Sequence, residues 1–93
     1  MPGSELFLDV SDLEPPEPLV KVLTEAERLE PGQYLHMRHR REPCLLYPNL
    51  DKRGFSHLTQ ASSEGHYHVF IWSRGDTAAE RAARSAAGVS AGE

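Results

Sequence analysis

The chain has 93 residues, of which 39% are hydrophobic and 26% are charged, and its net charge is −4. This length provides one small domain with a single core. No apolar run approaches the roughly 20 residues that span a bilayer, and an acidic chain is poorly suited to duplex nucleic acid, which proteins bind by neutralising phosphates. We therefore expect a cytoplasmic protein with neither a membrane nor duplex nucleic acid as its partner. The single cysteine cannot form a disulfide within the chain.

Charge is distributed unevenly along the sequence. Residues 1–30 carry eight acidic and two basic side chains, which gives this third a net charge of −6. Residues 31–74 carry six basic and three acidic side chains, a net charge of +3, and residues 75–93 carry −1. The basic side chains include a cluster at residues 38–41, which needs an explanation of its own.

The first elements are separated by a proline-rich stretch. Residues 6–10 form a short apolar run that predicts a β-strand, and because the run is apolar on both faces we expect an interior strand. The stretch Pro15-Pro16-Glu17-Pro18 follows, directly before an apolar stripe at helical spacing. Proline is tolerated in the first turn of a helix, since the N–H that it lacks has no partner there. This stretch therefore predicts the start of a helix, which Pro31-Gly32 ends.

The later elements complete the predicted fold. Residues 33–39 alternate as a strand does, so that a βαβ unit with a parallel strand pair is expected. A shorter helix is predicted to begin at Leu45 or Leu46, because Pro48 cannot lie deep in a helix. Residues 55–61 and 67–73 bracket a turn-forming stretch and predict a hairpin.

The predicted fold class is an α+β two-layer sandwich of order β-α-β-α-β-β, with two helices on one face of a four-stranded mixed sheet. The domain is predicted over residues 6–74, between a flexible N-terminus at 1–5 and a disordered Ala/Gly/Ser-rich tail at 75–93. Within the tail, residues 77–87 have no stripe of large apolar side chains and are expected to form at most a transient helix.

Two helices cover only one face of such a sheet. Tyr34, Phe70 and Trp72 are predicted on the other face, where they would form an apolar patch of the kind that marks a partner or dimer surface. The alternative is that the tail packs over this patch.

Three stretches of the sequence carry a resemblance to a known family. They are Leu8-Asp9-Val10, Leu13-x-x-Pro16-Glu17-Pro18, and Leu29-x-Pro31-Gly32 with the strand that follows. Over roughly residues 6–74 the chain resembles the TusA-like (SirA-like) superfamily of sulfur carriers. The resemblance implies the same β-α-β-α-β-β fold, with both helices on one face of a mixed sheet.

The chain departs from that family at its reactive position. Sulfur carriers have Cys-Pro-x-Pro, with a persulfide-bearing cysteine at the helix N-terminus, whereas the corresponding residue here is Pro15. Sulfur transfer by the family's mechanism is therefore not expected. The chain is most similar to a branch of uncharacterised bacterial domains that carry proline there, and that share stretches like Arg41-Glu42-Pro43-x-Leu45-Leu46-Tyr47 and Arg53-Gly54-Phe55. Members of this branch are linked to hemerythrin-like or other metal and redox modules, which implies a redox or nitrogen-oxide setting.

The loops after the first two strands are expected at the same end of the sheet, where open α/β sheets bind their ligands. The charged and polar candidates on these loops are Asp12, Glu14, His39, Arg40 and Arg41. Two helix N-termini add positive potential there, so the predicted ligand is a small anion or an acidic group on a partner protein. The alternative is that the arginines pair with Asp12, Glu14 or Glu17 and tie the loops together.

Cys44 and the histidines are further candidates. Cys44 lies near the start of the second helix with arginines nearby, a setting that can activate a thiol, although a lone cysteine is more often a small buried hydrophobic residue. His66 and His68 would share a strand face and are the metal candidates, but no set of residues has zinc-site spacing. Solvated strand-face histidines are the simpler interpretation.

We favour a non-enzymatic binding or adaptor module without a cofactor. Its expected partner is another protein, with a small anion or a second copy of the chain as alternatives. Two other function classes stay open at this point: a thiol or sulfur relay that uses Cys44, and a histidine-based metal or haem module.

Overall fold

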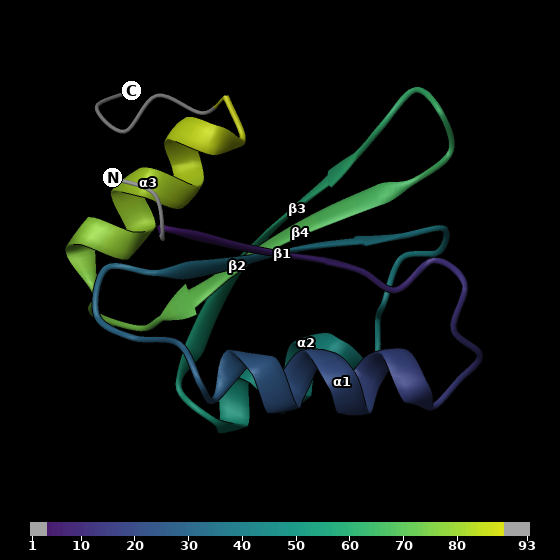
Figure 1. Cartoon of the computed structure of the whole chain (residues 1–93), viewed down its shortest axis with the longest axis horizontal. Coiled ribbons are helices and arrows are strands. Elements are labelled where there is room, and N and C mark those ends of the chain that lie inside the picture. Colours follow the sequence, from purple (N-terminus) through teal and green to yellow (C-terminus); the bar gives the residue numbers. More distant parts are fainter. Residues whose placement is uncertain (1–3, 89–93) are drawn as a thin grey trace.

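The computed structural model describes residues 4–88 of the chain. The elements follow in the order β1 (Glu5–Asp9), α1 (Glu17–Ala26), β2 (Tyr34–His39), α2 (Leu46–Lys52), β3 (Phe55–Ala61), β4 (Tyr67–Ser73) and α3 (Thr77–Ala86) (Figure 1). The first six elements confirm the predicted order. α3 is an additional helix.

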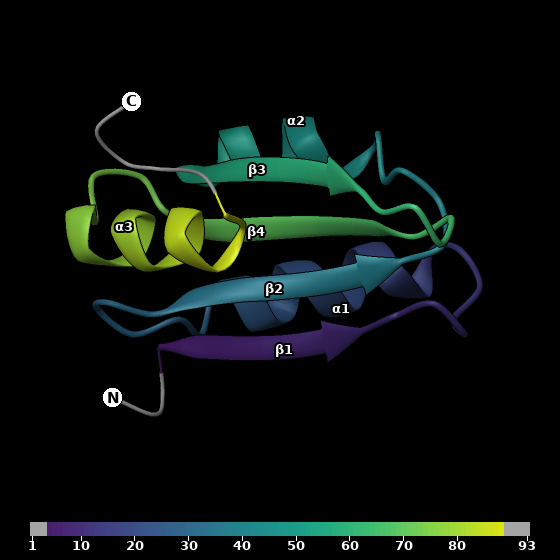
Figure 2. The ribbon, with the colours of Figure 1, turned by 90° about the horizontal axis from the view of Figure 1, so that it is seen from above.

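The strands form one mixed sheet in the order β1-β2-β4-β3 (Figure 2). β1 and β2 are parallel, whereas β4 is antiparallel to both β2 and β3. α1 and α2 lie on one face of the sheet, which we call the inner face, and α3 lies on the outer face (Figure 1). The predicted α+β fold is therefore confirmed.

β1 is an edge strand, so the prediction of an interior strand was wrong. Leu6 and Leu8 pack against the inner core, while Phe7 points to the outer face and is 54% exposed. The Phe7 ring meets the His36 ring edge-on, at 5.0 Å between centroids. A strand with apolar residues on both faces can still lie at the edge of a sheet, because the pattern along a strand indicates nothing about the number of neighbouring strands.

The inner core lies between the sheet and the helices α1 and α2. Its fully buried side chains come from all of these layers and include Val22, Leu35, Leu50, Val69 and Ile71. This packing fixes α1 under β1 and β2, and so it places the start of α1 beside the end of β2.

Both inner helices begin where the sequence indicated. Pro16 is the N-cap of α1, and Pro18 is its second residue, so neither proline interrupts a helical hydrogen bond. α2 begins at Leu46, which leaves Pro48 within its first turn. The Pro15–Pro16 peptide bond is cis.

α3 contradicts the expectation of a disordered tail for the described part of residues 75–93. Ala79 and Ala83 are fully buried against an outer cluster that contains Tyr34, Phe70 and Trp72. Residues 89–93 lie outside the described residues. α3 therefore covers the predicted apolar patch, which is not open to a partner. This agrees with the alternative interpretation, in which the tail packs over the patch.

Specific polar contacts hold α3 in place. The Asp76 carboxylate caps the helix by accepting from the Ala79 N–H at 3.0 Å, and it also accepts from the Gly32 N–H at 2.9 Å. At the other end, the side chain of Gln60 donates to the Ala87 carbonyl at 2.6 Å. These bonds tie both ends of α3 to the sheet domain.

The N-terminal end is also more ordered than expected. The Ser4 carbonyl accepts from the Tyr34 N–H at 2.8 Å, and β1 already begins at Glu5. The prediction of a flexible segment at 1–5 is therefore wrong for these two residues. Residues 1–3 lie outside the described part of the chain.

Candidate functional site

The loop after β1 and the loop after β2 lie at the same end of the sheet, as predicted from the parallel strand pair. Between them lies a groove with a volume of about 220 Å³. Its walls come from the start of α1, the end of β2 and the segment that leads into α2. They are lined by Pro15, Pro16, Pro18, Leu19, Met37, His39, Arg41, Glu42, Pro43, Leu45 and Leu46. We call this the strand-end groove.

His39 is the buried polar residue of the strand-end groove. It is only 7% exposed, and its Nδ1 has no hydrogen-bond partner among residues 4–88. Burial lowers the pKa of His39, and the positive charges of Arg40 and Arg41 lower it further. The Val10 backbone, which hydrogen-bonds to the ring, opposes this shift only in part. The ring is therefore mostly neutral at pH 7.

The two arginines have different roles. Arg40 forms an ion pair with Glu14, at 3.5 Å between Nη2 and Oε2, and both side chains are about half exposed or more. Such a surface pair contributes little to stability. Arg41 lines the groove and forms no ion pair within the described residues. The alternative that the arginines tie the loops together therefore holds for Arg40 alone.

The start of α1 offers few backbone donors for an anion. Pro16 and Pro18 have no N–H, and the N–H of Glu17 already donates to the Glu14 carbonyl at 2.9 Å. The positive potential expected from this helix start is therefore not matched by free donors. Arg41 is left as the group in the groove that can pair with a negative charge.

The five predicted loop residues are thus only partly brought together. His39 and Arg41 share the strand-end groove, and Arg40 and Glu14 pair at its rim. Asp12 instead lines a separate groove beside α1. The sequence missed the contribution of prolines and leucines to the walls, because the shape of the groove depends on how two loops pack.

Cys44 is exposed and free. Its N–H donates to the Glu42 carbonyl at 2.9 Å, in the turn that leads into α2. The interpretation of Cys44 as a small buried residue was therefore wrong. Its neighbours Pro43 and Leu45 line the strand-end groove, and Cys44 itself does not.

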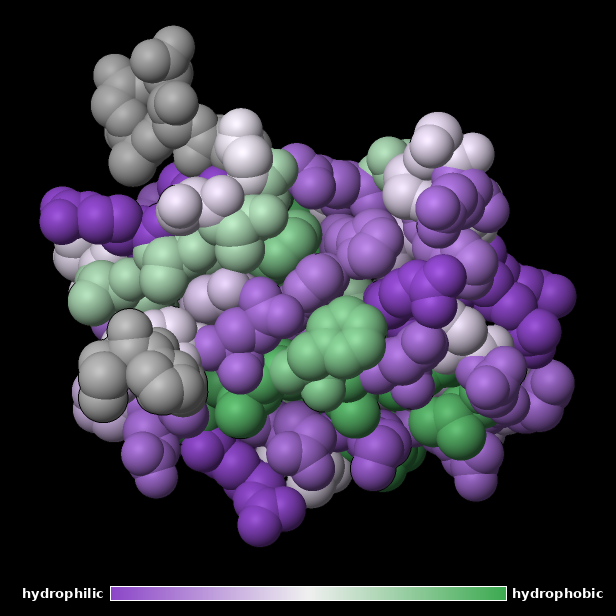
Figure 3. Space-filling view, turned by 45° about the horizontal axis from the view of Figure 1, so that its top comes forward, coloured by the Kyte–Doolittle hydropathy of each residue, from purple (hydrophilic) through white to green (hydrophobic). Residues whose placement is uncertain are grey.

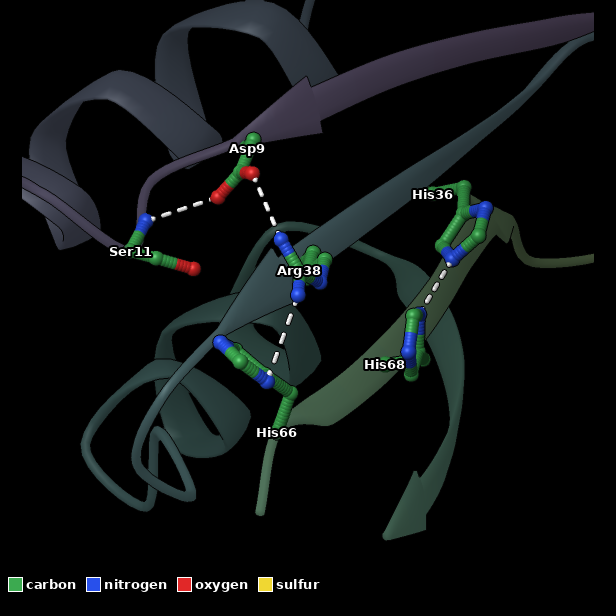
Figure 4. A network of polar contacts seen from close by, with 6 residues as sticks. All are labelled: Asp9, Ser11, His36, Arg38, His66 and His68. Carbon is green, nitrogen blue, oxygen red and sulfur yellow. Dashed lines mark hydrogen bonds and ion pairs between the residues drawn. The ribbon is translucent and has the colours of Figure 1, made fainter. Parts of the chain in front are cut away.

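The histidines of the outer face are engaged with protein groups (Figure 4). His36 Nε2 lies 2.8 Å from His68 Nδ1. Arg38 contacts two other groups: its Nη2 lies 3.3 Å from His66 Nδ1, and its Nη1 donates to Asp9 Oδ2 at 3.0 Å. His66 and His68 thus have different partners rather than one shared ligand. Across residues 4–88, no group of three or more His, Cys, Asp or Glu side chains could hold a metal ion.

This polar network shifts two pKa values. Burial lowers the pKa of His68, and the nearby charges of His36, Arg38 and His66 add to the effect. Hydrogen bonds from Ser11 lower the pKa of Asp9, and Arg38 lowers it further. The network is therefore set up for neutral His68 and ionised Asp9 near pH 7.

The fold and the groove define a small α+β domain with a groove at the ends of its parallel strands. The chain belongs to a family of uncharacterized conserved proteins (DUF2249), whose family model matches residues 7–73. That match ends just before α3. Comparison with curated proteins and with solved structures gave no match.

No helix within residues 4–88 is long and apolar enough to cross a membrane. The cytoplasmic location stays a prediction, and so does the resemblance to the TusA-like superfamily.

Proposed function

We propose that the domain is a non-enzymatic binding module, and that the strand-end groove takes a small apolar group that carries a carboxylate. The ligand is either the C-terminal residue of a partner protein or a free small acid, since both present the same chemistry. The observation that carries the proposal is Arg41, which forms no ion pair among residues 4–88 and lies in a groove whose walls are mostly proline and leucine. A guanidinium beside apolar walls suits a ligand that joins a carboxylate to an apolar body.

The size of the groove limits the ligand. Its volume of about 220 Å³ is smaller than the roughly 300 to 1,000 Å³ of ordinary small-molecule pockets. The groove therefore suits one side chain or a few-atom organic acid, and it is too small for a nucleotide cofactor. The walls of proline and leucine favour an apolar body for this group.

Charge and hydrogen bonding orient the ligand. Arg41 supplies a planar, permanently charged group that can bind a carboxylate in bidentate fashion. His39 supplies a neutral ring nitrogen. A ligand with its apolar part against Leu19 and Leu46 and its carboxylate at Arg41 uses the base and the apolar walls of the groove, and its carboxylate must lie away from Glu42, the acid of the lining.

The resemblance to TusA-like carriers supports binding without chemistry. Pro15, which replaces the carrier cysteine in that comparison, is one wall of the groove, and Cys44 is not among the lining residues. No thiol therefore lies in the wall to bear a persulfide. We place the TusA-like relationship, including the proline-for-cysteine exchange, within this proposal.

The test is an NMR titration of the ¹⁵N-labelled chain with four probes. They are 3-phenylpropionate, its amide, the peptide acetyl-Gly-Gly-Phe with a free C-terminus, and the same peptide amidated. We expect both carboxylates to shift the amides around the groove and the His39 ring nitrogens, and both amides to bind more weakly. A free acid that binds as tightly as the peptide indicates a small-molecule ligand, whereas a tighter peptide indicates a partner C-terminus.

Arg41→Ala and Arg40→Ala form a matched pair for this titration. Arg41→Ala is expected to weaken carboxylate binding by about tenfold, which is ~1.4 kcal/mol, while Arg40→Ala leaves it unchanged because Arg40 pairs with Glu14. Equal effects of the two variants, or shifts that bypass the groove, contradict the proposal.

A further inference from the structure

We infer that the open edge of β1 docks an extended, basic segment of a partner protein, which joins the sheet as a fifth strand. This surface is separate from the strand-end groove. In Figure 2, β1 is one of the two edge strands of the sheet, at the opposite side from β3.

The hydrogen-bond ladder between β1 and β2 shows which backbone groups of β1 are free to pair. The Ser4 carbonyl accepts from the Tyr34 N–H, and the Val10 N–H donates to the Arg38 carbonyl at 3.0 Å, so the even-numbered residues bond to β2. Bonding groups alternate along a strand. The N–H and C=O groups of Glu5, Phe7 and Asp9 therefore point away from the sheet, where no strand lies among residues 4–88.

β1 also lacks most of the features that usually protect an edge strand. Proteins blunt such edges with short strands, charged side chains, proline, bulges or a covering element. The sequence of β1 is Glu-Leu-Phe-Leu-Asp, with no proline and no basic residue, so its charged side chains repel only acidic strands, and Phe7 is 54% exposed beside the open edge. An added strand would therefore find both free backbone groups and an aromatic side chain to pack against.

The charge beside this edge specifies the occupant. Asp9, the last residue of β1, also lines an open groove of about 580 Å³ that continues along α1. The charged side chains of that groove are Asp9, Asp12, Glu17, Lys21 and Glu25, four acids against one base. Asp9 is paired with Arg38, which leaves three acids against Lys21. Val20, which is 58% exposed, lies among them. The complementary segment alternates basic and apolar side chains.

A second copy of the chain fits this edge poorly. Antiparallel pairing of two β1 strands about Phe7 places Glu5 opposite Asp9 of the second copy, at both ends of the pair. Like charges directly opposite each other destabilise a strand pair. The acidic edge therefore selects a basic partner over self-association.

The test uses the full-length chain and two seven-residue probe peptides, acetylated and amidated. One alternates Lys and Val, and the other alternates Glu and Val. We expect the lysine peptide to shift the backbone amides of Glu5, Phe7 and Asp9, to slow their hydrogen exchange, and to bind more weakly as salt is added. The glutamate peptide is expected not to bind.

Phe7→Pro tests the backbone pairing directly. It removes an outward N–H and no bond to β2, so the fold is expected to survive, and binding of the lysine peptide is expected to fall more than tenfold. Asp12→Lys tests the charge, with Glu30→Lys as its control, because Glu30 is exposed and lies outside the groove. Asp12→Lys should weaken binding several-fold more than the control.

Several results would overturn the inference. They are equal binding of the two peptides, shifts away from β1, equal effects of Asp12→Lys and Glu30→Lys, and a concentration-dependent dimer that Phe7→Pro dissociates. If Phe7→Pro unfolds, the lysine-substituted pair still decides the question.

Discussion

The two faces of the sheet are built on different principles. On the inner face, large aliphatic side chains such as Leu35 and Ile71 pack against large residues of α1 and α2. On the outer face, one half holds large aromatic rings under the alanines of α3, and the other half holds the network of His36, Arg38 and His68. Figure 3, with the top of Figure 1 turned forward, shows hydrophobic and hydrophilic side chains next to each other on the surface. Large side chains on the strands already fill most of the space between the sheet and the helix. The helix that covers them therefore carries small residues at the contact.

This difference predicts where a cavity costs most. Leu50 of α2 is fully buried in the inner core. Leu50→Ala is expected to lower the free energy of unfolding by about 2 to 5 kcal/mol, measured by urea denaturation. Leu45→Ala, at a side chain that is 76% exposed, is the control and should stay within about 0.5 kcal/mol of the wild type. Equal losses for both variants would mean that the inner core is not the main source of stability.

On the outer face, we expect the enlargement of a buried side chain, rather than its truncation, to be destabilising. Ala83 is fully buried against the aromatic cluster, so Ala83→Leu overfills the layer and should cost about 1 to 3 kcal/mol. The chain has one tryptophan, and Trp72 lies under α3, so its fluorescence reports whether α3 is docked. We expect a red shift for Ala83→Leu and none for the control Ala78→Leu, because Ala78 is exposed. Identical spectra would contradict the packing of α3.

The difference between the two faces also explains which elements could be predicted from the sequence. The stripe of α1 and the alternation in β2 contain large apolar residues, so the inner layer and the order of the elements along the chain follow from periodicity. The covering stripe of α3 consists of Ala79 and Ala83, and alanine adds little to a hydrophobic pattern. Its purpose becomes visible only when Tyr34, Phe70 and Trp72 are placed beneath it.

The polar sites depend on register, which periodicity does not fix. Arg38 lies opposite His68 and His36 lies opposite Phe70, so the contact of His36 with His68 is a diagonal one between β2 and β4. From the sequence, His66 and His68 were instead predicted to share a strand face as metal candidates. The two loops that flank the strand-end groove were correctly predicted at one end of the sheet, because parallel strands end at the same edge. The walls of the groove could not be predicted from residue types.

The cap of α3 offers a milder test of the outer layer. Asp76 accepts from the N–H groups of Ala79 and Gly32, and these two bonds lower its pKa. Asp76→Ala is expected to loosen α3 without unfolding the inner core, and Asp76→Asn, which keeps one acceptor oxygen, should do so less. The measurements are Trp72 fluorescence and hydrogen exchange at the Gly32 amide. Unchanged exchange at Gly32 in the alanine variant would contradict the link between α3 and the loop before β2.

The smallest expected effect is a dependence of the free energy of unfolding on pH near 6.5. One histidine on each face of the sheet contributes to it. The pKa values of His39 on the inner face and His68 on the outer face are both lowered from 6.5 in the folded chain. The unfolded chain therefore binds more protons as the pH falls below about 6.5, and stability decreases in that direction. Urea midpoints at pH 7.5, 6.5 and 5.5 measure the slope, which His68→Gln should reduce without removing, because His39 still titrates. A midpoint that rises on acidification, or a slope that His68→Gln leaves unchanged, would mean that the outer network does not hold His68 neutral.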